Sequence, residues 1–145
     1  MKIAKTLFIP GILLLAIVTG CVFTSTYSNR EEDKADAEKV THKLFEYLKS
    51  KDYDGACSLF SKEFYTVTPK DSLKGMFTMV QNDLGDLQQD SLAQWSTKVV
   101  TGTDPSSEYL MIYKDHHQKH DCLDSIRMIK EDDGKIRIVF YHVGY

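Results

Sequence analysis

Apolar residues recur at helical spacing in two stretches of the chain. In residues 31–50 they lie three or four positions apart, between an acidic start and a lysine-bearing end that suit the helix dipole. A second stripe ends at Leu84, after Thr68 and Pro69, which favour a helix start, and before Gly85, which favours a helix end. The pattern predicts helices over residues 31–50 and 69–84. A short helix over residues 53–60 and an apolar link over residues 64–67 are expected between them.

Short apolar and β-branched runs dominate the rest of the chain. They occupy residues 92–101, 108–114, 122–131 and 135–143, with turn-forming residues between them. Asp133 followed by Gly134 is a tight hairpin signal. Strands this close in sequence pair as antiparallel neighbours. The sequence therefore predicts an α+β domain in which N-terminal helices pack on a curved four-stranded antiparallel sheet.

The first twenty residues differ in composition from the rest. Lys2 and Lys5 precede an uncharged, mostly apolar run over residues 7–19, shorter than the roughly 20 apolar residues of a spanning helix. The run leads into a motif that resembles the lipobox of bacterial lipoproteins: Val18, Thr19, Gly20 and Cys21. We therefore predict a cleaved signal peptide over residues 1–20. An uncleaved N-terminal anchor, or an ordinary signal with a nearby cysteine, is the alternative.

The lipobox resemblance implies that Cys21 is acylated and attaches the protein to a lipid bilayer. Residues 21–32 are then the lipidated cysteine and a flexible tether, unless this Ser- and Thr-rich stretch packs on the domain as a strand or arm. Residues 33–145 form a single domain. The expected location is the bacterial cell envelope. Because Val22 and not Asp follows the cysteine, the resemblance favours the outer membrane, facing the periplasm, if the organism is Gram-negative.

Composition narrows the choice of partners. Apolar residues make up 42% and charged residues 27% of the chain, which is typical of a globular protein. The net charge of -3 provides no basic footprint for nucleic acid. With Cys21 lipidated, Cys57 and Cys122 remain in an export setting that permits a disulfide between them; two separate buried thiols are the alternative.

Residues 45–48 and 51–56, around the end of the first helix, and residues 84–87 leading to Trp95 carry a family resemblance. Together with the order of elements, they resemble the nuclear transport factor 2-like superfamily, a cystatin-like cone whose sheet wraps around a long helix. The similarity covers about residues 35–145. The superfamily includes isomerases, dehydratases, transport adaptors and extracytoplasmic binding modules, so the resemblance implies a fold and not one activity. The chain has no clear match to the Tyr-plus-Asp pair of the steroid isomerase branch.

Three histidines lie in one polar stretch, residues 115–121. His116, His117 and His120 are candidate ligands for Zn or Cu. The favoured interpretation is a solvated hairpin turn, because Lys119 would repel a cation and the adjacent His116 and His117 would face opposite sides of a continuing strand. We therefore predict neither a metal site nor a cofactor.

Recognisable catalytic motifs are missing from the sequence, which contains neither a Gly-x-Ser-x-Gly elbow nor a Gly-rich phosphate loop. We predict a non-catalytic membrane-anchored module that binds a small ligand or an envelope protein; the alternative is a lyase or isomerase acting in the cone's pocket. Tyr109, Tyr113, Phe140 and Tyr141 lie on adjacent predicted strands, where they pack in the core or contact a ligand. Converging polar groups in an apolar cavity would indicate a pocket, whereas an exposed apolar patch would indicate an adaptor.

Overall fold

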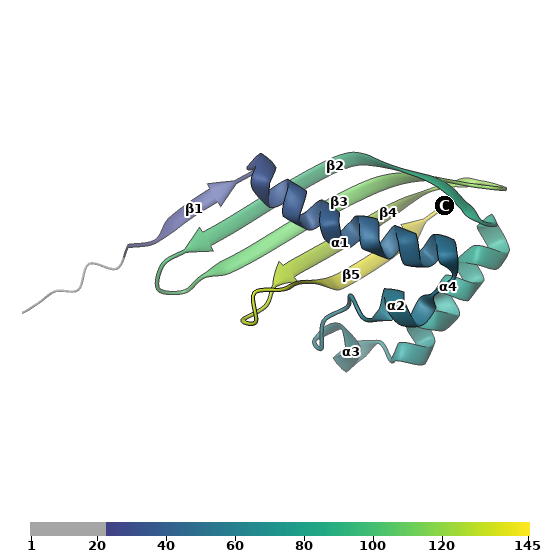
Figure 1. Cartoon of the computed structure of the whole chain (residues 1–145), viewed down its shortest axis with the longest axis horizontal. Coiled ribbons are helices and arrows are strands. Elements are labelled where there is room, and N and C mark those ends of the chain that lie inside the picture. Colours follow the sequence, from purple (N-terminus) through teal and green to yellow (C-terminus); the bar gives the residue numbers. More distant parts are fainter. Residues whose placement is uncertain (1–22) are drawn as a thin grey trace, which may run out of the picture.

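The computed structural model describes residues 23–145 (Figure 1). The predicted signal peptide over residues 1–20 and the predicted lipidation site at Cys21 lie outside the described residues. Within residues 23–145, no helix is both long enough and apolar enough to cross a membrane. The elements, in chain order, are β1 (Ser25–Ser28), α1 (Glu31–Ser50), α2 (Tyr53–Cys57), α3 (Phe64–Val67), α4 (Lys70–Leu84), β2 (Leu87–Thr101), β3 (Ser106–His117), β4 (Asp121–Lys130) and β5 (Ile136–Gly144).

The architecture is α+β, with helices on an open five-stranded antiparallel sheet in the order β1-β2-β3-β4-β5. Each strand pairs with the next in sequence, which confirms the expected antiparallel meander. Figure 1 shows α1 lying across one face of the sheet, with α2, α3 and α4 gathered near one end of α1. The helices thus cover the sheet from one side.

The strand count differs from the four strands that the sequence predicts. Ser25–Ser28 pairs with the end of β2, with Ser25 opposite Thr101 and Ser28 opposite Lys98. All four residues of β1 are exposed, so the strand shows no alternation of buried and exposed side chains that the sequence could reveal. The stretch expected to be a flexible tether therefore contains an edge strand, which was the alternative considered for it.

The long helices begin and end close to where their patterns predict. The helix α1 covers residues 31–50, and Lys51 in a left-handed conformation ends it by donating its N–H to the last carbonyl groups. The helix α4 ends at Leu84, before Gly85 at φ +83°. The helix α2 stops at Cys57 instead of continuing to residue 60, because Phe60 forms a bridge with Ile138 of β5. Residues 64–67, expected to be an apolar link, form the short helix α3.

The helix α1 is fixed to the sheet through Tyr113 of β3. The hydroxyl groups of Thr41 and Tyr113 lie 2.6 Å apart in a buried hydrogen bond. One turn further along α1, Phe45 meets the Tyr113 ring edge-on, at 4.8 Å between ring centroids. Burial raises the pKa of the Tyr113 phenol to about 12, so it is neutral. A polar and an aromatic contact on one side chain thus set how α1 lies over the sheet.

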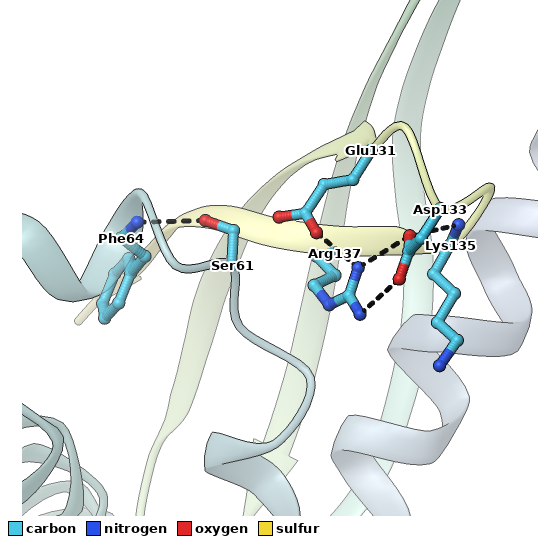
Figure 2. A network of polar contacts seen from close by, with 6 residues as sticks. All are labelled: Ser61, Phe64, Glu131, Asp133, Lys135 and Arg137. Carbon is cyan, nitrogen blue, oxygen red and sulfur yellow. Dashed lines mark hydrogen bonds and ion pairs between the residues drawn. The ribbon is translucent and has the colours of Figure 1, made fainter.

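The turn between β4 and β5 is closed by ion pairs, as Figure 2 shows. Arg137 donates two hydrogen bonds to the carboxylate of Asp133, at 3.0 and 2.8 Å, and pairs with Glu131. The guanidinium holds the pKa of Asp133 at about 2. Gly134 adopts φ +79°, as a tight turn requires, which agrees with the hairpin predicted at this position.

We expect Tyr113→Phe to lower the free energy of unfolding by about 1 kcal/mol, because it removes the buried hydrogen bond across the helix–sheet interface while the Thr41 hydroxyl keeps its bond to Glu38 O. Thr41→Val should cost a similar amount, since it leaves the phenol unpaired. Urea denaturation of both variants and of the double variant measures the coupling. The double variant should lose about 1 kcal/mol less than the sum of the single losses. Strictly additive losses would contradict the role given to this hydrogen bond.

Candidate functional site

Polar side chains replace apolar ones at one end of the inner sheet face. Along β3 the buried positions are Tyr109, Met111, Tyr113, Asp115 and His117. Asp115 of β3 pairs with Cys122 of β4, and Asp124 follows Cys122 two positions later on the same buried face. Side chains two residues apart on a strand point to the same side. Asp115, His117, Cys122 and Asp124 therefore gather inside the domain near the β3–β4 turn.

The carboxyl group of Asp115 is buried and receives no hydrogen bond from an N–H, O–H or S–H donor among the described residues. The residue is 1% exposed, and neither of its oxygens accepts from such a donor among the described residues; its polar neighbour is the carboxyl group of Asp124. Burial, reinforced by the negative charge of Asp124, raises the pKa of Asp115 to about 9, so the group is protonated at neutral pH. Buried side-chain polar atoms nearly always have a partner, so this carboxyl group marks the site as unusual.

Asp124 is also buried but receives two hydrogen bonds. The hydroxyl of Tyr141 donates to one carboxyl oxygen, and the thiol of Cys122 donates to the other at 3.6 Å. Burial raises the pKa of Asp124, and these two donors oppose that rise. Burial also raises the pKa of the Cys122 thiol and that of the Tyr141 phenol. Both carboxyl groups of this pair therefore hold a proton more tightly than an exposed aspartate does.

The β3–β4 turn is docked on the end of α4. The imidazole Nδ1 of His117 lies 3.0 Å from the carbonyl oxygen of Gly85, just after the helix. Lys119 donates its backbone N–H to Leu84 O at 2.9 Å and its ammonium to Asn82 O at 2.6 Å. The prediction of a solvated turn over residues 115–120 is thus corrected for Asp115 and His117, which belong to β3 and are buried. The strand continues three residues beyond the predicted end at Lys114.

A small cavity opens against these side chains. About 30 Å³ is accessible to the centre of a water molecule, between apolar side chains that include Phe77 and Val80 of α4 and the polar group of Asp115, His117 and Asp124. One water needs roughly 10–15 Å³ by this measure, so the cavity has room for about two waters or one ion. It combines apolar walls with converging polar groups, which is the arrangement expected of a ligand pocket on a small scale.

Three of the buried side chains form a set of metal donors. Asp115, His117 and Cys122 each offer a ligand atom, and these atoms lie within 4.8 Å of one another. A carboxylate oxygen, an imidazole nitrogen and a thiolate sulfur together suit a borderline cation such as Zn²⁺. The cluster thus offers a mixed N/O/S donor set, of which Asp115 and His117 line the cavity.

The structure separates the three histidines that the sequence proposes together. His116 is on the outer sheet face, with its Nδ1 2.5 Å from Asp121 Oδ1, and its side chain is 66% exposed. His120 is also exposed, in the turn. Only His117 reaches the buried cluster. The expectation that His116 and His117 would face opposite sides of a continuing strand agrees with this placement.

Cys57 and Cys122 are both buried, and in the structure both are free thiols. Cys57 ends α2, where its carbonyl oxygen accepts a hydrogen bond from the Tyr65 hydroxyl at 2.6 Å. Cys122 instead contacts Asp124 in the buried cluster. The structure therefore corresponds to the alternative of two separate thiols.

Asp115 and Asp124 are the site residues that the sequence reasoning missed. The polar stretch over residues 115–121 predicts a turn, and a turn does not define which way the Asp115 side chain faces. The signal that could have found it is the two-residue alternation of β3, which continues from Tyr113 through Asp115 to His117. The matching alternation in β4 places Cys122 and Asp124 inward.

Comparison of the chain with protein-family models, curated protein sequences and solved structures gives no match.

We expect Asp115→Asn to stabilise the metal-free protein above neutral pH. The folded-state pKa is raised from 3.8 to about 9, so between these values the folded protein holds a proton that the unfolded chain has released. Stability therefore falls as pH rises through this window. Asn cannot ionise, so the variant should be more stable than the wild type at pH 8, and the gain should shrink towards pH 4.

Urea denaturation between pH 4 and pH 9 in the presence of EDTA measures this difference. The other groups that influence Asp115 are Asp124 on β4, Asp90 on β2 and Lys49 on α1, and none of them is changed by the substitution. Asp121→Asn removes an exposed carboxyl group near the same turn and should give no gain at pH 8. A variant at Asp115 with the pH dependence of the wild type would show that this carboxyl group does not control stability.

Proposed function

We propose that this chain is a membrane-anchored extracytoplasmic lipoprotein whose domain is a non-catalytic module that binds a small ligand in the cavity beside Asp115. The observation that carries this proposal is the buried Asp115 carboxyl group on the cavity wall, whose two oxygens accept no hydrogen bond from a donor group among the described residues. A ligand in the cavity would supply the donor or cation that these oxygens can accept.

The dimensions of the cavity define the class of ligand. With about 30 Å³ open to water centres, the site accepts an ion or a molecule of a few heavy atoms. Typical pockets for drug-sized molecules occupy roughly 300–1,000 Å³. The ligand in this proposal is therefore small and polar, and the apolar wall formed by α4 shields it from water.

The proposal keeps Cys21 as the acylated attachment point and residues 1–20 as the signal peptide. Their support is the lipobox-like order of charge, apolar run and cysteine in the sequence. The cell envelope, with the outer membrane favoured in a Gram-negative organism, is the corresponding location. A curved, cone-like sheet similar to that of the nuclear transport factor 2-like superfamily belongs to the same proposal, supported by α1 lying across one face of a meander.

An envelope protein is the second candidate partner. A groove of about 440 Å³ lies between α4 and the end of β5, lined by residues that include Met79 and Tyr145. These two side chains are 52% and 66% exposed, and β5 is the last strand of the sheet. An extended segment of a partner could pair with such an edge while its side chains enter the groove.

A lyase or isomerase remains the enzymatic alternative. The protonated Asp115 is a proton donor in a cavity, which is the feature that favours this class. The small volume beside Asp115 favours binding over turnover of an organic substrate.

Cys21→Ser should abolish lipid attachment, because the lipid of a bacterial lipoprotein is carried on the cysteine sulfur. In a bacterial host, metabolic labelling with palmitate should mark the wild-type protein and not the variant, and the variant should remain an unprocessed precursor. Cys57→Ala, which removes a buried thiol of the domain, is the matched control and should keep the label. Equal labelling of the wild type and Cys21→Ser would overturn the anchor.

Ligand binding is tested by thermal unfolding of the full chain in detergent with two panels, one of small polar metabolites and one of inorganic ions. A ligand at 100 times its Kd should stabilise the wild type by about 2.7 kcal/mol and raise its Tm. Asp115→Asn should lose that shift while remaining folded. A shift retained by the variant would place the ligand elsewhere.

Crosslinking in intact envelopes, carried out alongside the ligand screen, tests the envelope-protein alternative. A reproducible protein partner without any shift in either panel would favour the envelope protein, and consumption of a shifting metabolite would establish the enzyme. An absence of shifts in both panels would overturn the binding cavity.

A further inference from the structure

The strongest chemical feature outside ordinary packing is the set of donors on the inner faces of β3 and β4. Asp115 and Cys122 face each other across the two strands, and His117 follows Asp115 on the same side. Their ligand atoms lie within 4.8 Å of one another. All three residues are at most 7% exposed, so the donors point into the protein and not into solvent.

The environment of His117 prepares it to act as a ligand. Its Nδ1 lies 3.0 Å from the carbonyl oxygen of Gly85, which can only accept a hydrogen bond, so Nδ1 carries the proton. The lone pair is then on Nε2. A hydrogen bond from the second ring nitrogen to a backbone carbonyl is the usual support of a metal-bound imidazole, because it fixes the tautomer and the ring orientation.

The donor set also matches the charge of a divalent cation. Asp115 and Asp124 are both buried, and the nearby Lys49 is paired with Asp90 at 2.5 Å. A divalent ion bound by one carboxylate, one thiolate and one neutral imidazole forms a neutral unit. It would interact with the Asp115 oxygens, which accept no hydrogen bond from a donor group among the described residues.

We propose that Asp115, His117 and Cys122 bind a Zn²⁺-class cation, with the fourth coordination position facing the cavity. This inference rests on the proposed binding function and names its ligand. The sulfur and nitrogen donors select against Mg²⁺ and Ca²⁺, which prefer oxygen ligands. Three protein ligands with an open fourth position match a zinc site that keeps a water molecule or a small anion.

Asp124 supports this site from the side. It accepts the thiol hydrogen of Cys122 in the metal-free protein and the hydroxyl hydrogen of Tyr141. Binding of the cation releases the protons of the Cys122 thiol and the Asp115 carboxyl group, so affinity falls as pH is lowered. Tyr141 then keeps Asp124 oriented beside the ligands.

The test is titration of the full chain, freed of metal with EDTA and held in detergent, with Zn²⁺ by calorimetry and with Co²⁺ by absorption. We expect one ion per chain at micromolar affinity or tighter, and a thiolate-to-cobalt absorption band. Asp115→Asn should weaken Zn²⁺ binding at least about ten-fold, because losing even a group that only supports a metal ligand costs that much. Cys122→Ser should abolish the band.

Two features of the design separate ligand loss from unfolding. Urea denaturation of the metal-free Asp115→Asn variant shows whether it is folded, so that weaker binding by a folded variant is assigned to the lost ligand. Matched controls come from the outer face and from the second thiol: His116→Ala, His120→Ala and Cys57→Ala should bind Zn²⁺ and Co²⁺ like the wild type.

Each remaining outcome contradicts a defined part of the proposal. Binding that is lost in His116→Ala or His120→Ala but kept in Asp115→Asn would overturn it in favour of the surface histidines. Zn²⁺ and Co²⁺ binding no tighter than millimolar, with Tm shifts from the metabolite panel, would overturn the metal and leave the binding cavity. An absence of response to metals and metabolites alike would overturn both.

Discussion

The buried polar site near the β3–β4 turn depends on the burial of one carboxyl group. Asp115 follows Tyr113 on the inward face of β3, where α4 and the docked β3–β4 turn separate it from water. An ionised carboxylate in that position would be costly, so the group stays protonated beside Asp124. The same burial that forces the proton onto Asp115 also leaves its oxygens free for a ligand. Stability and binding therefore make opposite demands on this residue.

One strand links the core to the site. Tyr113 is fixed by Thr41 and Phe45 of α1, and Asp115 lies two residues further on the same face. The packing of the helix on Tyr113 therefore helps to set the position of the carboxyl group. The carbonyl oxygen of Gly85, just after α4, orients His117. Both α1 and the end of α4 therefore help to position the side chains of the site. The site is assembled by helices that the sequence separates by two short elements.

The sequence predicted the helices best because their signals are local. The stripe in α1 and the Gly85 stop of α4 gave bounds close to those observed. The edge strand β1 was missed because its side chains are all exposed and only its backbone pairs. The site was missed because polar residues near a turn resemble solvated ones, and only the pairing of β3 with β4 shows that Asp115 is opposite Cys122. Long-range register of this kind leaves little trace in local composition.

The edge strand β1 alters the mechanical relation between the domain and its proposed anchor. Only Val22 to Thr24 separate Cys21 from β1, a span of at most roughly 14 Å when fully extended. A lipid on Cys21 would thus hold the domain through a short segment and not through a long flexible tether. From Lys98, opposite Ser28, to Leu87 at the cavity, β2 runs eleven residues, or roughly 36 Å. The strand β2 would therefore act as a rigid spacer between the proposed attachment point at one end and the cavity beside Asp115 at the other.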